Sequence, residues 1–128
     1  MKEVTAAIIR DGDKILICQR SADDECALLW EFPGGKREIG ESLEECLIRE
    51  IREELELDIK FLGEFAKTKY RFNGNEIHFT VYNAEVIGGM LKLNVHNDVE
   101  WVMVGELNRF DFMPADIEFV EKIIKEWK

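Results

Sequence analysis

The sequence predicts a single α/β domain in which a mixed β-sheet lies between helices. Strand-like segments occur before and after an amphipathic helix near residues 42–55, and a second amphipathic helix ends the chain. This order of elements favours a sheet that is covered by helices on both faces. Since 128 residues with 46% hydrophobic content suit one ordinary globular domain, we expect residues 1–128 to form one unit.

The first half of the sheet is predicted from apolar segments and the turns between them. Residues 5–10 and 14–20 are apolar-rich, and the Asp-Gly-Asp at residues 11–13 is typical of a hairpin turn. Residues 30–32 alternate between apolar and polar side chains. The Pro-Gly-Gly at residues 33–35 predicts a sharp turn that leaves backbone N–H groups free.

The helix that follows has a start signal and an apolar stripe. Ser42 is expected to be its N-cap, with Glu45 as the capping-box partner. The stripe recurs at helical period and should pack on the sheet. It consists of Leu43, Leu47, Ile48, Ile51 and Leu55.

The second half of the chain predicts three more strands and the final helix. Residues 58–72 and 76–86 are long strand-like segments around an Asn-Gly-Asn turn, and residues 100–104 form a shorter one. Residues 112–116 introduce the final helix. Its expected apolar face consists of Phe119, Val120, Ile123, Ile124 and Trp127.

Charge and composition exclude several classes of function. The net charge is −10, from 27 acidic and 17 basic residues, which argues against sequence-blind binding to nucleic acid. No apolar run is long enough to span a bilayer and the N-terminal segment lacks a signal-peptide core, so we expect a cytoplasmic protein that binds no membrane. The three cysteines form no C-x-x-C pair and are expected to be reduced.

Three acidic residues on the first helix predict a divalent-metal site. At about 100° per residue, Glu50, Glu53 and Glu54 fall on one arc beside the apolar stripe. Carboxylate oxygens suit Mg²⁺, and also Mn²⁺, which share the phosphates of a substrate. The alternative is a solvated helix face laced by ion pairs.

The spacing around this arc resembles the Nudix box, G-x5-E-x7-R-E-U-x-E-E-x-G-U, in which U is aliphatic. Eight positions fit: Gly35, Glu41, Arg49, Glu50, Ile51, Glu53, Glu54 and Leu57. Glu56 departs from the pattern, because the family usually has a glycine there that ends the helix in a left-handed turn. The α/β/α sandwich of the Nudix fold agrees with the order of elements predicted above.

The resemblance implies roles for the residues of the box. Glu50, Glu53 and Glu54 would bind or orient the metal together with the main-chain carbonyl of Gly35. One glutamate, with Glu50 the first candidate, would take the proton from water. Two further residues would support this site: Arg49 would orient a carboxylate, and Glu41 would fix the loop or act in the outer sphere.

Outside the box, the chain resembles the MutT-like branch of the family, which hydrolyses nucleoside triphosphates to monophosphate and pyrophosphate. The resemblance rests on LLWEFPGGK at residues 28–36, on Arg20 and on FMPAD at residues 112–116. It implies that Arg20 and Lys36 contact the substrate. Phe32 and Phe72 would offer an apolar surface to the base.

Asp116 has two interpretations. The resemblance implies that it meets the base edge, where an ionised Asp accepts only, whereas the Asn of some relatives both donates and accepts. Alternatively, it caps the last helix after Pro114. One side chain could do both.

A second departure concerns an extra metal ligand. Val95-His96 stands where many relatives have a glutamate followed by a histidine, so Asp98 or Glu100 would supply that ligand, or it is missing. We expect His78 and His96 to be structural, since neither has a partner at ligand spacing.

The leading hypothesis is a Mg²⁺-dependent pyrophosphohydrolase that acts on small nucleotides, with oxidised dGTP as the substrate that it removes. The enzyme alternatives are hydrolases of CTP, of a modified pyrimidine triphosphate or of ADP-ribose. A non-catalytic nucleotide-sensing module is disfavoured because all three box glutamates remain. The sequence leaves a monomer and a homodimer open.

Overall fold

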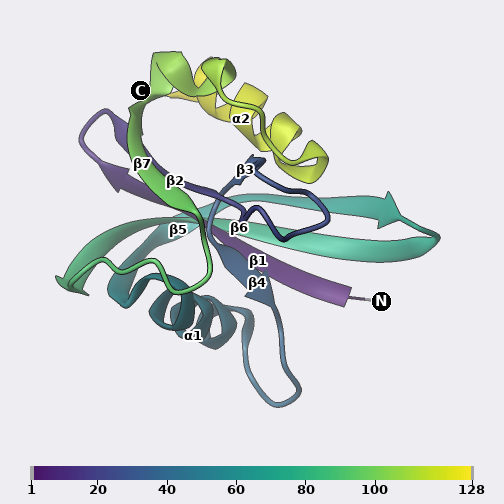
Figure 1. Cartoon of the computed structure of the whole chain (residues 1–128). Coiled ribbons are helices and arrows are strands. Elements are labelled where there is room, and N and C mark those ends of the chain that lie inside the picture. The colour runs from purple at the N-terminus through teal and green to yellow at the C-terminus, as the bar shows by residue number, and fades with distance from the viewer. Residues whose placement is uncertain (1, 128) are drawn as a thin grey trace.

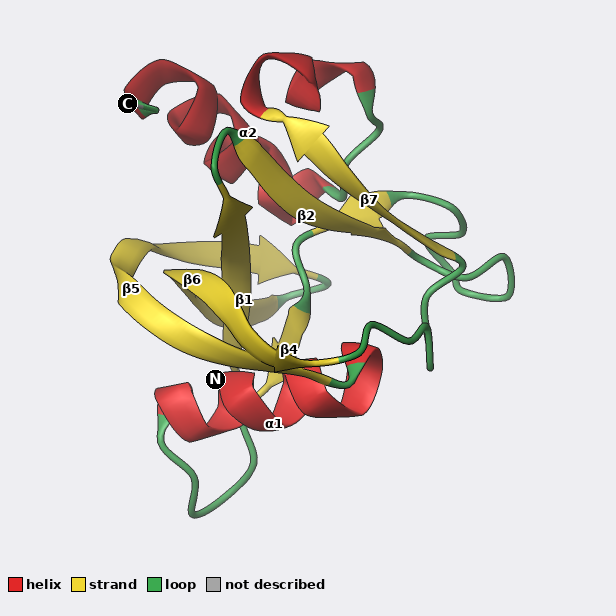
Figure 2. Cartoon of the chain, turned by 90° about the vertical axis from the view of Figure 1, so that its left-hand side faces the viewer, coloured by secondary structure: helices red, strands yellow, loops and turns green. Residues whose placement is uncertain are grey.

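The computed structural model describes residues 2–127, apart from the side chain of Phe72. It confirms the predicted α/β class, with a mixed sheet between two helices (Figures 1 and 2). The strands are β1 (Lys2–Asp11), β2 (Lys14–Gln19), β3 (Trp30–Glu31), β4 (Gly34–Lys36), β5 (Leu57–Phe72), β6 (Asn75–Gly89) and β7 (Asp98–Met103). The helices are α1 (Leu43–Leu55), the 3-10 helix η1 (Val104–Arg109) and α2 (Pro114–Glu126).

Strand β1 is the centre of the sheet. It pairs in parallel with β6 and antiparallel with β2 and β4, while β5 and β6 form a long antiparallel hairpin. Strand β7 pairs antiparallel with β2. Helix α1 covers one face of this assembly, and α2 lies with η1 on the opposite side (Figures 1 and 2).

Both predicted hairpins are confirmed, whereas the sharp turn predicted at Gly34-Gly35 is wrong. These glycines lie in β4, where Gly35 pairs with Thr5 and Gly34 pairs with Ala6. Close approach explains the glycine at position 34, because an added Cβ would lie 2.0 Å from the carbonyl oxygen of Thr5. The backbone N–H of Gly34 also favours the charged form of Glu54, whose pKa it lowers in part.

Helix α1 begins as the sequence predicts. The backbone N–H of Glu45 donates to the Ser42 hydroxyl at 3.0 Å, and the Ser42 N–H donates to the Glu45 carboxylate at 2.8 Å. Its buried face packs on the sheet with Leu47, Ile51 and Leu55 fully enclosed. The capping box and this stripe therefore orient the arc of glutamates beside the sheet.

The helix ends at Glu56, which adopts the left-handed conformation with φ 56° and ψ 35°. We expect Glu56→Gly to raise the free energy of unfolding by about 0.5 kcal/mol, because a Cβ is unfavourable in this conformation. The gain is reduced by loss of the hydrogen bond from the Asn94 amide to the Glu56 carboxylate, 3.0 Å long. Urea denaturation of Glu56→Gly and Glu56→Ala tests this, since Ala loses the same bond but keeps the Cβ. Equal stability of the two variants would contradict the account.

The final helix and its surroundings differ in part from the prediction. Phe119, Val120 and Ile123 are buried as expected, but Ile124 is 41% exposed. The six-residue 3-10 helix η1 was not predicted, and Gly105 within it is one reason, because glycine is unfavourable in helices. Neither α-helix described between residues 2 and 127 is long and apolar enough to cross a membrane.

Candidate active site

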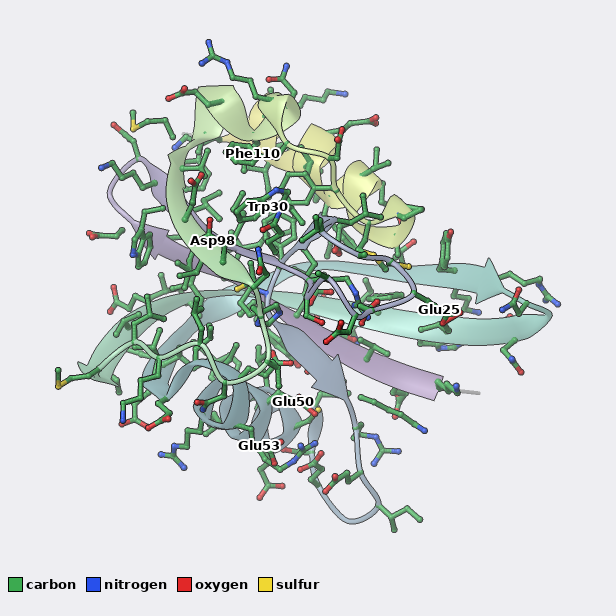
Figure 3. The ribbon with its side chains drawn as sticks, viewed as in Figure 1. Glu25, Trp30, Glu50, Glu53, Asp98 and Phe110 are labelled. Atoms are coloured by element: carbon green, nitrogen blue, oxygen red, sulfur yellow. The ribbon has the colours of Figure 1, made fainter. Side chains whose placement is uncertain are left out.

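Arg49 is the centre of the charged network on α1. Its guanidinium lies 2.9 Å from Glu50 and 3.2 Å from Glu53, and it binds Glu41 through two nitrogens at 2.6 and 3.0 Å. The hydrogen bond with Arg49 is the main cause that lowers the pKa of Glu41 to about 2. Figure 3 shows Glu50 and Glu53 close together on α1. The structure thus holds four members of the predicted site in one network.

Glu54 faces the interior beside this network. Its Oε1 atom is buried and has no hydrogen-bond partner among the described residues. Burial, with added repulsion from Glu50 and Glu31, raises the pKa of Glu54 to about 8, although the Gly34 N–H partly opposes the shift. An oxygen so placed lacks a positive partner, and a bound cation would supply one.

Gly35 leaves space for the carboxylate of Glu50. A Cβ at position 35 would lie 2.3 Å from the Glu50 carboxyl carbon. Burial also raises the pKa of Glu50, even though Arg49 opposes the shift. The donor set around Glu50 and Glu54 consists of hard oxygens and fits a divalent metal ion. Among the described residues, no three acidic, histidine or cysteine side chains lie close enough together to hold a metal ion in the present conformation.

A cavity of about 230 Å³ adjoins Glu54. Five of the predicted site residues line it: Arg20, Phe32, Gly35, Glu54 and Asp116. They come from the loop after β2, the residue that follows β3, and from β4, α1 and α2, so only the fold brings them together. A larger groove of about 670 Å³ between η1 and α2 contains none of the predicted site residues.

Asp116 does not cap the last helix, which corrects one of its two interpretations. The N-cap of α2 is Met113, and Asp116 lies in the first turn with only 6% of its surface exposed. Burial, followed by repulsion from Glu31, raises the pKa of Asp116 to about 8, although a hydrogen bond from the Phe32 backbone opposes the shift. At neutral pH the side chain is therefore mainly a neutral carboxyl group that both donates and accepts.

The raised pKa of Asp116 predicts a pH-dependent gain in stability for Asp116→Asn. Between about pH 4 and 8 the folded protein keeps a proton that the unfolded chain has lost, so this aspartate makes the fold less stable as pH rises. The advantage of Asn should therefore grow over this window and reach the order of 5 kcal/mol at pH 8.

Urea denaturation at several pH values measures this gain, with Asp24→Asn as the control. The hydrogen bond with Arg20 lowers the pKa of Asp24, so its contribution is fully present above about pH 4 and is lost in more acidic solution. The Asp24 difference should stay constant between pH 5 and 8. An Asp116 difference that is also constant there would contradict the expected protonation.

Arg20 belongs to a second charged network at the cavity, and the sequence did not predict its partners. The guanidinium binds Asp24 at 2.7 and 2.9 Å and Glu31 at 2.8 Å. His96, which is buried, lies 2.9 Å from the other oxygen of Glu31. Alternation over residues 30–32 was a signal that Glu31 faces away from its apolar neighbours. Its partners could not be found this way, because His96 is 65 residues distant.

The remaining predicted residues lie outside this cavity. The side chain of Lys36 is exposed, and its backbone carbonyl accepts a hydrogen bond from Arg49 at 3.1 Å. Phe72 ends β5, but its side chain lies outside the described part of the chain. Asp98 and Glu100 do not line the cavity, and Figure 3 shows Asp98 on β7, away from Glu50. His78 pairs with Glu76 at 2.7 Å on the β5–β6 hairpin.

Comparison with known proteins gives consistent matches over most of the chain. The NUDIX domain model matches residues 1–123. A CTP pyrophosphohydrolase of Escherichia coli K12 is 38% identical over 122 residues, which are 94% of this chain and 90% of that protein. An 8-oxo-dGTP diphosphatase of the same organism is 32% identical over 122 residues, 94% of this chain and 95% of that protein. The solution structure of the E. coli ORF135 protein matches with a TM-score of 0.87 and 36% identity, covering 98% of this chain and 89% of that one.

Proposed function

Because this chain belongs to the NUDIX domain family, we propose that it is a divalent-metal-dependent nucleoside triphosphate pyrophosphohydrolase. It converts a nucleoside triphosphate and water to the monophosphate and pyrophosphate. The proposed substrate is oxidised dGTP, and the metal ion is Mg²⁺, for which Mn²⁺ can substitute. Residues 1–128 act as one domain on a free nucleotide in the cytoplasm.

The observation that supports this proposal best is the position of Glu54. Its unpartnered, buried oxygen lies at the edge of a cavity that Arg20 and Asp116 also line. The Glu54 carboxylate that is proposed to bind the cation therefore lies beside the Arg20 guanidinium and beside the recess that is proposed to receive the base. A metal ion and positive charge stabilise the transferring phosphoryl group, and the recess can receive the base.

Each residue of the site has a proposed task. A divalent ion, when bound, would neutralise the phosphates and lower the pKa of water. Glu50, Glu53 and Glu54 would hold that ion with the Gly35 carbonyl, and Glu50 would accept the proton from water. Burial raises the pKa of the Glu50 carboxyl, which makes it a stronger base than an exposed glutamate.

Arg49 and Glu41 keep the carboxylates in place. Arg49 contacts both Glu50 and Glu53, and Glu41 binds Arg49 through two hydrogen bonds. Arg20 in the cavity wall and the exposed Lys36, which follows the cavity residue Gly35, attract the phosphates. The protein has a net charge of −10, so these local cations and the metal ion must overcome general repulsion of a polyanion.

Asp116 is proposed to meet the base edge. A neutral carboxyl group can donate to O6 of a guanine base and accept from its N1–H. It can pair equally well with N3 and the N4 amino group of cytosine, so CTP is a second candidate. The 38% identity to a CTP pyrophosphohydrolase favours testing both. Phe32 lines the cavity and packs against Phe112 with ring centroids 5.4 Å apart, so it would offer the base an apolar surface that is held in place.

A panel of triphosphates assayed for pyrophosphate release tests this function. The panel should include dGTP, 8-oxo-dGTP, CTP and dCTP, with ADP-ribose as a diphosphate control, in the presence of Mg²⁺. We expect kcat/KM to be highest for 8-oxo-dGTP and activity to vanish with EDTA. Absence of hydrolysis for every triphosphate would refute the proposal, and preference for CTP would select the second candidate.

A further inference from the structure

Glu31 is held from two sides in the wall of the cavity. Its Oε1 atom accepts a hydrogen bond from Arg20 at 2.8 Å, and its Oε2 atom lies 2.9 Å from Nε2 of His96. Glu31 and Arg20 both line the cavity, whereas His96 does not. The His96 side chain is 4% exposed and stands behind Glu31. His96 can therefore affect a bound molecule only through Glu31.

The segment that contains His96 is also attached to α1. The backbone N–H of Asn94 donates to the carbonyl of Glu54 at 3.1 Å, and its amide group donates to the carbonyl of Glu53 at 2.9 Å. The Lys92 N–H donates to the carbonyl of Leu55 at 2.9 Å. Residues 92–96 thus connect the last turn of the glutamate helix to Glu31 on the other wall.

Arg20 needs this support because it has two competing partners. Asp24 binds the guanidinium through two nitrogens at 2.7 and 2.9 Å, and Asp24 lies in the loop after β2. Glu31 offers only one hydrogen bond to the same group. If the Glu31 side chain were free to rotate, the position of the Arg20 guanidinium would depend on Asp24 alone. The bond to His96 removes that freedom and fixes the third donor of the guanidinium.

We propose that His96 is a positioning residue for nucleotide binding, which acts by holding Glu31 against Arg20 in the cavity wall. This inference rests on the function proposed above. His96 contacts neither the carboxylates of α1 nor the Gly35 carbonyl in the described structure. Its loss should therefore weaken binding of the nucleotide and leave the chemical step nearly unchanged.

Two substitutions at position 96 test the role. His96→Leu keeps the apolar bulk and removes the donor, whereas Gln in place of His96 can put an amide N–H near the position of Nε2. For His96→Leu we expect KM for the preferred triphosphate and Kd for its monophosphate product to rise about tenfold, with kcat within about twofold of wild type. His96→Gln should keep both constants within about threefold of wild type.

Two further variants separate positioning from general stability. In a Glu31→Gln background, His96→Leu should change KM less than about twofold, because the charged partner is already gone. Asn97→Ala is the matched control. Asn97 follows His96 and donates to the Gln19 side chain at 2.7 Å, but in the described structure neither of these side chains is hydrogen-bonded to the side chain of Glu31 or Arg20. It should leave KM and kcat unchanged.

The outcomes are distinct from those that test the function. A wild-type protein that hydrolyses no triphosphate refutes the proposed activity, while titration with monophosphate still tests His96. An unchanged product Kd in His96→Leu, a fall in kcat at constant KM, or full additivity with Glu31→Gln would overturn the inference. If His96→Leu does not fold, His96→Asn replaces it, because the shorter amide does not reach Glu31 and the same losses are expected.

Discussion

Glu54→Gln is expected to lower kcat for triphosphate hydrolysis at least about 100-fold, since loss of a metal-binding carboxylate exceeds the usual 10- to 100-fold effect of removing a supporting residue. The amide keeps the shape of the side chain but loses the negative charge. Pyrophosphate release at saturating Mg²⁺ and nucleotide measures the effect.

The same substitution should make the metal-free protein more stable. Glu54 is buried with one oxygen unpartnered and lies near the charges of Glu50 and Glu31. Because the pKa of Glu54 is raised to about 8, the metal-free fold keeps this carboxyl group protonated at neutral pH while the unfolded chain does not, and a neutral amide avoids that cost. The amide is itself buried without a full set of partners, so we expect a net gain of about 1 to 2 kcal/mol in the free energy of unfolding. Urea denaturation in EDTA measures it.

Two other glutamates of α1 serve as controls. Glu53 has 59% of its side chain exposed and pairs with Arg49, so Glu53→Gln should lower turnover without a gain in stability. Glu44 is exposed in the first turn of the helix, and Glu44→Gln should leave turnover unchanged. Normal turnover in Glu54→Gln would contradict the metal assignment. A loss of stability would contradict the inference that its charge is unfavourable in the fold.

The parts of the fold that depend on local sequence could be predicted. The capping box of α1, its apolar stripe and the β5–β6 turn follow from residues within one or two turns of each other, where propensity and periodicity act directly. Glu56 departs from the glycine of the family pattern, but it adopts the left-handed conformation that the resemblance associates with this place.

The parts that depend on distant partners could not be predicted. Pro33-Gly34-Gly35 has the local pattern of a turn, but pairing with Thr5 and Ala6 of β1 makes it a strand. Asp116 follows Pro114 in the manner of a cap, yet packing buries it and Met113 is the N-cap. In both cases the deciding contacts come from another part of the chain.

The cavity shows the same limit. Its wall unites Arg20, Glu31 and Asp116 from separate elements, and the buried His96 behind it comes from a fourth segment. The Nudix-box residues that identify the glutamate helix are close together in the sequence, so the helix could be predicted. The residues proposed to select the nucleotide are neighbours because the sheet order places β2 and β3 next to the start of α2, and the sequence does not show this order.

Arg49→Lys is expected to lower kcat about 10- to 100-fold, although the positive charge is kept. The guanidinium binds Glu41, Glu50 and Glu53 at once and also donates to the Lys36 carbonyl. A lysine ammonium is one compact point of charge and cannot satisfy these separate acceptors in fixed directions. The carboxylates of Glu50 and Glu53 would then lose their common orientation.

Arg52→Lys is the matched control for this substitution. Arg52 lies one turn later on the same helix and pairs with Asp58, and both side chains are largely exposed. Arg52→Lys should therefore leave kcat within about twofold of wild type, since exposed ion pairs contribute little. If Arg49 acts through the pair with Glu41, Glu41→Gln combined with Arg49→Lys should cost less than the product of the two single effects. Equal losses at positions 49 and 52 would instead mean that the arginines merely stabilise the helix, and the orientation of Glu50 and Glu53 would need another cause.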